Sequence, residues 1–148
     1  MSDGFRALVN ATDALRALSR TATRIGNREL PNRQLAVQLQ GHVFKEFDTS
    51  GVFMGGAWPP LSPRRLAWKI KRNYSSRPLL MTGALRNSYL SFHDANQAGV
   101  RSRMSYAEAH ELGVPSRNLP QRSVLPSEQE ALDYAVRIYS RYIERITT

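Results

Sequence analysis

The stretch NSYLSFHDANQAGVRSRM, residues 87–104, decides the fold class of this chain. Its first half alternates Leu90 and Phe92 with more polar neighbours, and its second half alternates Arg101 and Arg103 with smaller or apolar ones. A period of two residues is typical of β-strands, and the polar ANQAG between the halves is suited to a turn. The stretch therefore predicts a β-hairpin.

Helical patterns flank this hairpin on both sides. Apolar residues recur every three to four positions over roughly residues 3–24, again from Pro31 through residue 47, and over about residues 127–146 after an N-cap at Ser127. We therefore predict an α+β fold, in which an N-terminal helix pair and a C-terminal helix pack on a small antiparallel β-sheet. An all-helical bundle with one hairpin is the alternative. A length of 148 residues predicts a single domain over residues 1–148.

Two long irregular segments interrupt this pattern. The first covers about residues 48–80 and contains GGAWPPLSPRRLAWK at residues 55–69, where Ser62 and Pro63 have the types that begin a helix. The second follows YAEAHEL, a short helix or turn that Gly113 ends, and its prolines keep it extended. We expect both segments to be docking loops.

The charge of the chain indicates a negatively charged partner. Lysine and arginine number 21 against 12 aspartates and glutamates, which gives a net charge of +9 and a pI near 10.6. Arginine makes forked pairs with carboxylates as readily as with phosphates, so both an acidic protein and a nucleic acid stay open. No apolar run approaches the roughly 18 residues of a membrane span, and no membrane partner is expected.

No motif for catalysis, metal binding or cofactor binding is found. HELG at residues 110–113 begins like a zinc-protease helix, but Val114 stands where the second histidine would be. Glycine-rich phosphate cradles and serine nucleophile motifs are absent, and the chain has no cysteine. We therefore expect no catalytic site, no metal, no cofactor and no enzymatic activity.

The cations around the tryptophans allow two interpretations. Basic side chains interleaved with aromatic rings can follow a phosphate backbone and stack on bases. Alternatively, Trp58 before two prolines anchors its loop on the core of the chain. A further row of Arg137, Arg141 and Arg145 on the C-terminal helix is either a solvated face or a binding ridge.

Three blocks occur in order along the chain: WPPLSPRRLAWK at residues 58–69, LLMTGALRNSY at 79–89 and YAEAHELGVPSRNLPQRSVL at 106–125. Together they resemble the virion morphogenesis or tail completion proteins of tailed phages. The resemblance covers about residues 40–125, and the additional proline in VPSRNL departs from the family's pattern.

This resemblance implies a structural virion protein at the head–tail junction, which completes or terminates the tail and joins it to the head. It implies a homo-oligomeric ring of six subunits in contact with the tail tube and with head-connector or neck proteins. DNA would pass through without sequence-specific binding, and the protein would be part of the virion after assembly in the host cytoplasm. A basic DNA-binding accessory protein of packaging or of the neck is the alternative.

The same blocks supply the predicted interface. Thr82 and Gly83 are expected to form a tight turn, and Arg86 after it pairs with an acidic residue either of a neighbour or of its own chain. We expect Trp58, Leu61 and Trp68 to be buried, and most cations, including Arg64, Arg65, Lys69 and the row on the C-terminal helix, to face other proteins or solvent. The predicted interface residues are Trp58, Pro59, Leu61, Arg64, Arg65, Lys69, Arg86, Tyr106, His110, Pro120 and Arg122.

Overall fold

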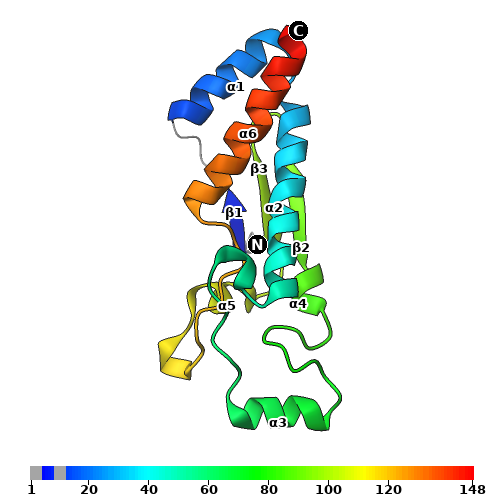
Figure 1. Ribbon diagram of the computed structural model, residues 1–148, viewed down its shortest axis with the longest axis vertical. Coiled ribbons are helices and arrows are strands. Elements are labelled where there is room, and N and C mark those ends of the chain that lie inside the picture. Colours follow the sequence, from blue (N-terminus) through cyan, green and yellow to red (C-terminus); the bar gives the residue numbers. More distant parts are fainter. Residues whose placement is uncertain (1–4, 9–12) are drawn as a thin grey trace. The chain divides into compact units, whose positions relative to one another are not determined.

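The computed structural model describes residues 5–8 and 13–148, and it combines helices with a small β-sheet (Figure 1). The predicted α+β fold class is confirmed. In chain order the elements are β1 (Phe5–Leu8), α1 (Asp13–Ile25), α2 (Glu29–Thr49), the 3-10 turn η1 (Val52–Met54), α3 (Pro63–Lys71), α4 (Ala84–Asn87), β2 (Tyr89–His93), β3 (Ala98–Ser102), α5 (Ala107–Leu112), η2 (Pro115–Arg117) and α6 (Glu128–Thr147).

The chain divides into two compact units. One, here called the loop unit, consists mainly of His42–Leu90 and Arg101–Leu125 and therefore contains both predicted docking segments. The other, here called the helical unit, consists of Arg6–Gly41, Ser91–Val100 and Pro126–Thr148. The single domain over residues 1–148 stays a prediction.

The predicted hairpin is confirmed, with β2 and β3 as its strands. Asp94 closes its turn: the main-chain N–H of Asp94 donates to the carbonyl of Gln97 at 2.9 Å, and its carboxylate accepts from the N–H groups of Asn96 and Gln97. The hydrogen bond from Asn96, followed by that from the Gln97 side chain, lowers the pKa of Asp94. The Asp94 carboxylate thus fixes the turn, because it accepts hydrogen bonds from the main-chain N–H groups that follow it.

A strand that the sequence did not indicate completes the sheet, whose order is β1-β3-β2. The helix predicted over residues 3–24 is wrong at its start, because Phe5–Leu8 form β1 and α1 begins only at Asp13. Pairing beside β3 supplies partners for the main-chain groups of this segment, and that gain outweighs its helical periodicity. Residues 3, 4 and 9–12 of the predicted helix lie outside the described residues.

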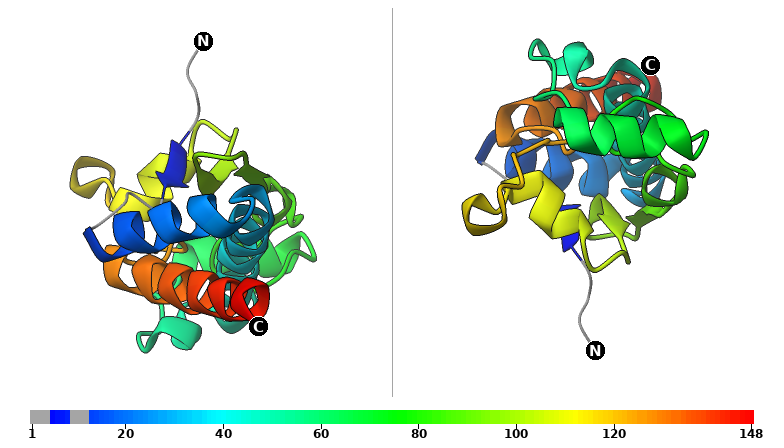
Figure 2. Two further views of the ribbon diagram at one scale, coloured as in Figure 1. Left: turned by 90° about the horizontal axis from the view of Figure 1, so that it is seen from above. Right: turned by 90° about the horizontal axis from the view of Figure 1, so that it is seen from below.

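Within the helical unit, α1 and α6 lie side by side (Figure 2). Gly26, which follows α1, lies close to α6, because an added Cβ there would be 2.5 Å from the hydroxyl of Tyr142. Ser127 caps α6 as predicted: its hydroxyl accepts from the N–H of Glu130, whose carboxylate accepts from the N–H of Ser127. This reciprocal pair satisfies two main-chain donors at the start of the helix.

Helix α2 begins at Glu29, two residues before the predicted start at Pro31. Asn27 accepts from the N–H of Glu29 at 2.8 Å, and proline is tolerated in the first turn because its missing N–H would have no helical partner there. Buried Asn32 then links three elements of the helical unit. It accepts from the Tyr139 hydroxyl at 2.5 Å and donates to the Asp94 carbonyl at 2.8 Å.

Aromatic rings form the core of the loop unit. Phe47 is fully buried, and the centroid of its ring lies 5.8 Å from that of Trp58 and 5.9 Å from that of Tyr89. The Tyr89 side chain is also buried, and burial raises the pKa of its hydroxyl. Among the helices of the described chain, none has the length and apolar character needed to cross a membrane.

Candidate interface site

Trp58 fixes the first irregular segment to the core of the loop unit. Its side chain is buried, and its indole N–H donates to the carbonyl of Ser123 at 2.9 Å. Gly51 has a φ of 87°, and an added Cβ there would overlap the indole ring. The interpretation of Trp58 as an anchor is confirmed, so this ring is not available to stack on a base.

Helix α3 follows from its predicted start signals. The hydroxyl of Ser62 accepts from the N–H of Arg65 at 3.3 Å, and Pro63 occupies the first helical position. At the other end of the helix, the ammonium of Lys69 donates to the carbonyls of Arg77 and Leu80 at 2.6 and 2.7 Å. These two bonds attach the chain after α3 to the helix itself.

The prediction that Lys69 faces solvent is therefore wrong, whereas its contact with a neighbouring protein stays a prediction. Its side chain is only 3% exposed, because main-chain carbonyls of its own chain solvate the ammonium. Burial, and then the positive charges of Arg65 and Arg122, lower the pKa of Lys69. Sequence alone gives no sign of this, since the two acceptors lie in an irregular loop.

Arg122 fixes the second irregular segment to the first. Its guanidinium donates to the carbonyls of Pro59 and Pro60 at 2.9 and 3.1 Å, and its side chain is 5% exposed. Its main-chain N–H donates to the carbonyl of His110 at 2.8 Å. Arg122 thus holds together the proline loop and α5, with no carboxylate as its partner in these bonds.

Glu111, which the sequence analysis did not single out, closes the second segment from within. Its buried carboxylate accepts from the hydroxyl of Ser123, from the N–H of Val124 at 2.8 Å and from the N–H of Leu125 at 3.4 Å. Burial raises the pKa of Glu111, and these three hydrogen bonds oppose the rise. A glutamate in a short helix carries no sequence signal that separates this role from a solvated one.

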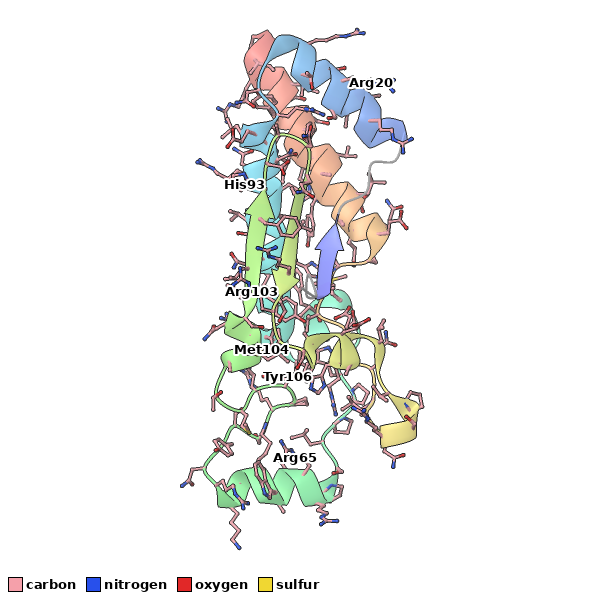
Figure 3. The ribbon with its side chains drawn as sticks, turned by 180° about the vertical axis from the view of Figure 1, so that it is seen from behind. Arg20, Arg65, His93, Arg103, Met104 and Tyr106 are labelled. Carbon is pink, nitrogen blue, oxygen red and sulfur yellow. The ribbon has the colours of Figure 1, made fainter. Side chains whose placement is uncertain are left out.

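A cavity of about 810 Å³ lies between α3, the turn before α4, α5 and the segment 118–122, all within the loop unit. Figure 3 marks two of its lining residues, Arg65 on α3 and Tyr106 next to the start of α5. The predicted Thr82–Gly83 turn also lines it in part, with Gly83 at a φ of 83°. The predicted interface residues that line the cavity are Leu61, Arg65, Lys69, Tyr106, His110, Pro120 and Arg122.

The remaining predicted residues, Trp58, Pro59, Arg64 and Arg86, do not line it. Arg64 is exposed on α3. Lining residues that the sequence analysis missed are mostly apolar, and they include Leu79, Met81 and Leu119. Apolar residues in a loop are uninformative in sequence, because the same types serve in a core and at an interface.

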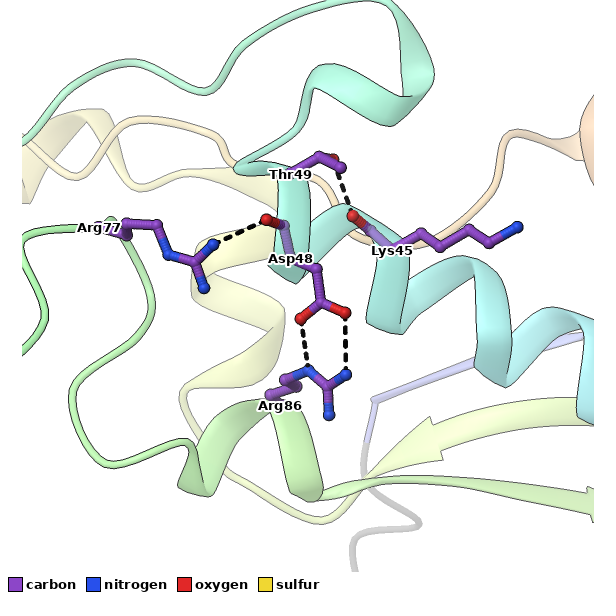
Figure 4. Close-up of polar contacts among 5 residues, drawn as sticks. All are labelled: Lys45, Asp48, Thr49, Arg77 and Arg86. Carbon is purple, nitrogen blue, oxygen red and sulfur yellow. Dashed lines mark hydrogen bonds and ion pairs between the residues drawn. The ribbon is translucent and has the colours of Figure 1, made fainter.

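Arg86 pairs within its own chain (Figure 4). Its Nε and Nη2 donate to the two carboxylate oxygens of Asp48 at 3.0 and 3.1 Å, and its guanidinium lies 4.2 Å from the Phe44 ring centroid. Arg77 donates to the main-chain carbonyl of Asp48 at 2.7 Å. Of the two alternatives for Arg86, the structure shows the pair with its own chain, and its role at an interface stays a prediction.

Trp68 is half-buried, and its ring is already in contact with charged and aromatic groups. The guanidiniums of Arg65 and Arg72 each lie 4.3 Å from its ring centroid, and Tyr74 stacks on it at 5.8 Å. Arg137, Arg141 and Arg145 are exposed on α6. Among the residues searched, which are those that the structure describes, no group of three or more histidine, aspartate or glutamate side chains is placed to hold a metal ion.

Comparison with known proteins identifies a family. A model described as the phage virion morphogenesis family matches residues 9–140, which is most of the chain. Searches of the curated proteins and of the solved structures found no match.

Proposed function

Because the chain belongs to the phage virion morphogenesis family, we propose that it acts at the head–tail junction, where it completes the tail and joins it to the head. Family membership indicates a structural role in the assembly of a phage virion. The proposal adds the place of action, a ring of identical subunits, and contact with the tail tube and with head-connector or neck proteins.

One observation carries this proposal beyond the family. The two irregular segments are tied to one another and to the core by Trp58, Lys69 and Arg122, yet they leave a cavity with exposed apolar residues such as Met81 and Tyr106 at its edge. Ordered loops with exposed apolar side chains are typical of a surface that another protein covers. The function best supported is therefore docking between virion proteins.

The environments of the two tryptophans support the alternative of a DNA-binding accessory protein less well than they support docking. Trp58 is buried, and two guanidiniums and the Tyr74 ring already contact the Trp68 ring. Stacking on bases needs a free aromatic face, and these contacts compete for it at Trp68. Exposed arginines such as Arg64 and Arg137 still allow a sequence-independent attraction to phosphates.

Deletion of the gene from the phage tests the proposal. Negative-stain images of the deletion should show DNA-filled heads separate from finished tails, and the wild-type protein supplied in trans should restore joined particles. Empty heads would favour a role in packaging, as expected of the DNA-binding accessory protein. Joined, infectious particles from the deletion would contradict both roles.

A further inference from the structure

The cavity holds positive charge without a negative partner. Arg65, Lys69 and Arg122 line it, whereas no aspartate or glutamate does. Among the side chains that the structure describes, no carboxylate forms an ion pair with any of these three cations. Two of them are almost fully buried, and a buried charge that lacks an opposite charge costs free energy that a carboxylate would offset.

Hydrogen-bond donors remain for such a carboxylate. The Lys69 ammonium uses two of its three donors on main-chain carbonyls, and the Arg122 guanidinium uses Nε and Nη2 but leaves Nη1. His110, which also lines the cavity, has a buried Nδ1 that lacks a hydrogen-bond partner in the described chain. Burial and the charge of Arg122 lower the pKa of His110.

The walls of the cavity indicate which other groups a molecule bound there should carry besides a carboxylate. Leu61, Leu79, Met81 and Leu119 make them largely apolar. A volume of about 810 Å³ accommodates a few side chains, within the range of roughly 300–1,000 Å³ for ligand pockets. Duplex DNA carries its phosphates on a wide cylinder and would not bring them to the buried cations. The occupant should combine a carboxylate with an apolar side chain.

The outer face of α5 has this combination. Glu108 is exposed and forms no ion pair with a cation of the described chain, and Leu112 is 60% exposed. These two residues are four positions apart, so they lie on one side of the helix, while Tyr106 and His110 face the cavity from nearly the opposite side. One side of α5 therefore lines the cavity, and the other side carries a carboxylate and an apolar side chain that match the cations and the apolar walls of the cavity.

We propose that the cavity binds the outer face of α5 of a second copy of this chain, with Glu108 of that copy directed at Arg65, Lys69 and Arg122 and its Leu112 against Met81 and Leu61. The two contacting surfaces are different, so each copy offers one of each. Such a contact is heterologous, and it generates a closed ring or an open filament. The inference rests on the proposed function only in assigning this contact to the ring at the head–tail junction.

Disulfide crosslinking of the full-length protein tests the contact, because the native chain has no cysteine that could interfere. Purified Leu112→Cys and Met81→Cys variants are mixed under mild oxidation and followed on non-reducing gels. Leu112 is 60% and Met81 43% exposed, so both variants should keep the wild-type melting temperature. The control pairs Met81→Cys with Val37→Cys, because Val37 is also 60% exposed.

The proposal expects the Leu112 and Met81 pair to form linked dimers at least about tenfold faster than the control pair, because docking raises the effective concentration of the thiols. The chain with both substitutions should give a ladder of linked oligomers. Equal rates for the two pairs would overturn the proposal. Protection of the Met81→Cys thiol from maleimide by duplex DNA would overturn it as well, in favour of a nucleic acid.

A charge exchange gives a second, independent measurement in the assembled virion. Glu108→Arg and Arg65→Glu, each supplied alone to the gene deletion, should lower the phage titre at least about tenfold, and the chain with both changes should recover most of it. Failure of the recovery while wild-type protein still complements would overturn this inference and leave the proposed function standing. Joined particles from the gene deletion without supplied protein would contradict the proposed function but not the contact between copies.

Discussion

Arg86 and Asp48 form a forked pair in which two guanidinium nitrogens donate to both carboxylate oxygens, although the residues are 38 positions apart. Asp48 lies near the end of α2, where its main-chain carbonyl also accepts a hydrogen bond from the Arg77 guanidinium. The Arg86 side chain is 27% exposed and that of Asp48 53%, so water weakens the attraction between them. The pair positions α4 against α2 within the loop unit more than it stabilises the fold.

A double-mutant cycle measures this pair. With Asp48→Ala and Arg86→Ala, we expect a coupling free energy of about 0.5–1 kcal/mol in urea denaturation. Arg77→Ala is the matched control, because Arg77 contacts the main-chain carbonyl of Asp48 and should show no coupling to its carboxylate. A charge reversal at Arg86 that blocked particle assembly without lowering stability would instead assign this residue to an interface.

A comparison of alanine substitutions at Gly51 and Gly55 distinguishes the cost of backbone strain from the cost of steric overlap. Both have positive φ, at 87° and 89°, but an added Cβ meets the Trp58 ring at Gly51 and nothing within 4 Å at Gly55. Gly55→Ala should lose about 1–2 kcal/mol of stability from the left-handed conformation alone. Gly51→Ala should lose roughly 1–3 kcal/mol more, because the indole must shift. Equal losses in chemical denaturation would show that the ring adapts without cost.

Tyr139→Phe should destabilise the helical unit. The change removes the hydrogen bond to Asn32 and leaves a buried amide oxygen without its donor, at a cost of about 1–3 kcal/mol. Tyr142→Phe, on the same helix, removes a hydroxyl that makes no hydrogen bond within the described residues and should change stability by less than about 0.5 kcal/mol. Thermal melting followed by circular dichroism checks both, and similar losses would contradict the role of Asn32.

Glu111 should make stability depend on pH. Burial raises its pKa above 4.5, so the folded state binds the proton more tightly than the unfolded state does. The tighter binding of this proton therefore contributes fully to the free energy of unfolding below pH 4.5. This contribution is lost as the pH rises through the pKa of Glu111 in the folded state. Glu111→Gln retains an oxygen acceptor for the N–H of Val124 and offers an NH2 donor to the Ser123 hydroxyl, but it should lack this slope.

Urea denaturation of both proteins from about pH 4 to pH 8 gives the comparison, because the difference between them isolates this one group. Glu128→Gln is the matched control for the loss of one carboxylate, since Glu128 is exposed on α6. A wild-type slope that persists in Glu111→Gln would place the titrating group elsewhere.

Elements that depend on local chemistry could be predicted from the sequence. Ser62 with Pro63, and Ser127 with Glu130, start their helices as expected because a cap requires only neighbouring residues. Strand β1 could not be predicted, because its pairing depends on β3, about ninety residues further on.

The candidate site was predictable in its residue types and less so in their roles. Trp58 before two prolines indicated an anchor, and the indole is buried as expected. The sequence predicts that Lys69 faces other proteins or solvent, and it does not single out Glu111. Only the path of the loops shows that they bind main-chain groups at residues 77, 80, 124 and 125.

The bonds of Trp58 and Arg122 also set the order in which the chain can mature during translation. They join partners 62 to 65 positions apart, so the proline loop is complete only after Ser123 has left the ribosome. Until then the nascent chain exposes an indole, and the carbonyls of Pro59 and Pro60 lack their donor. A slow stretch of translation before this point would prolong an aggregation-prone intermediate, and a fragment that ends there would be a target for chaperones and proteases.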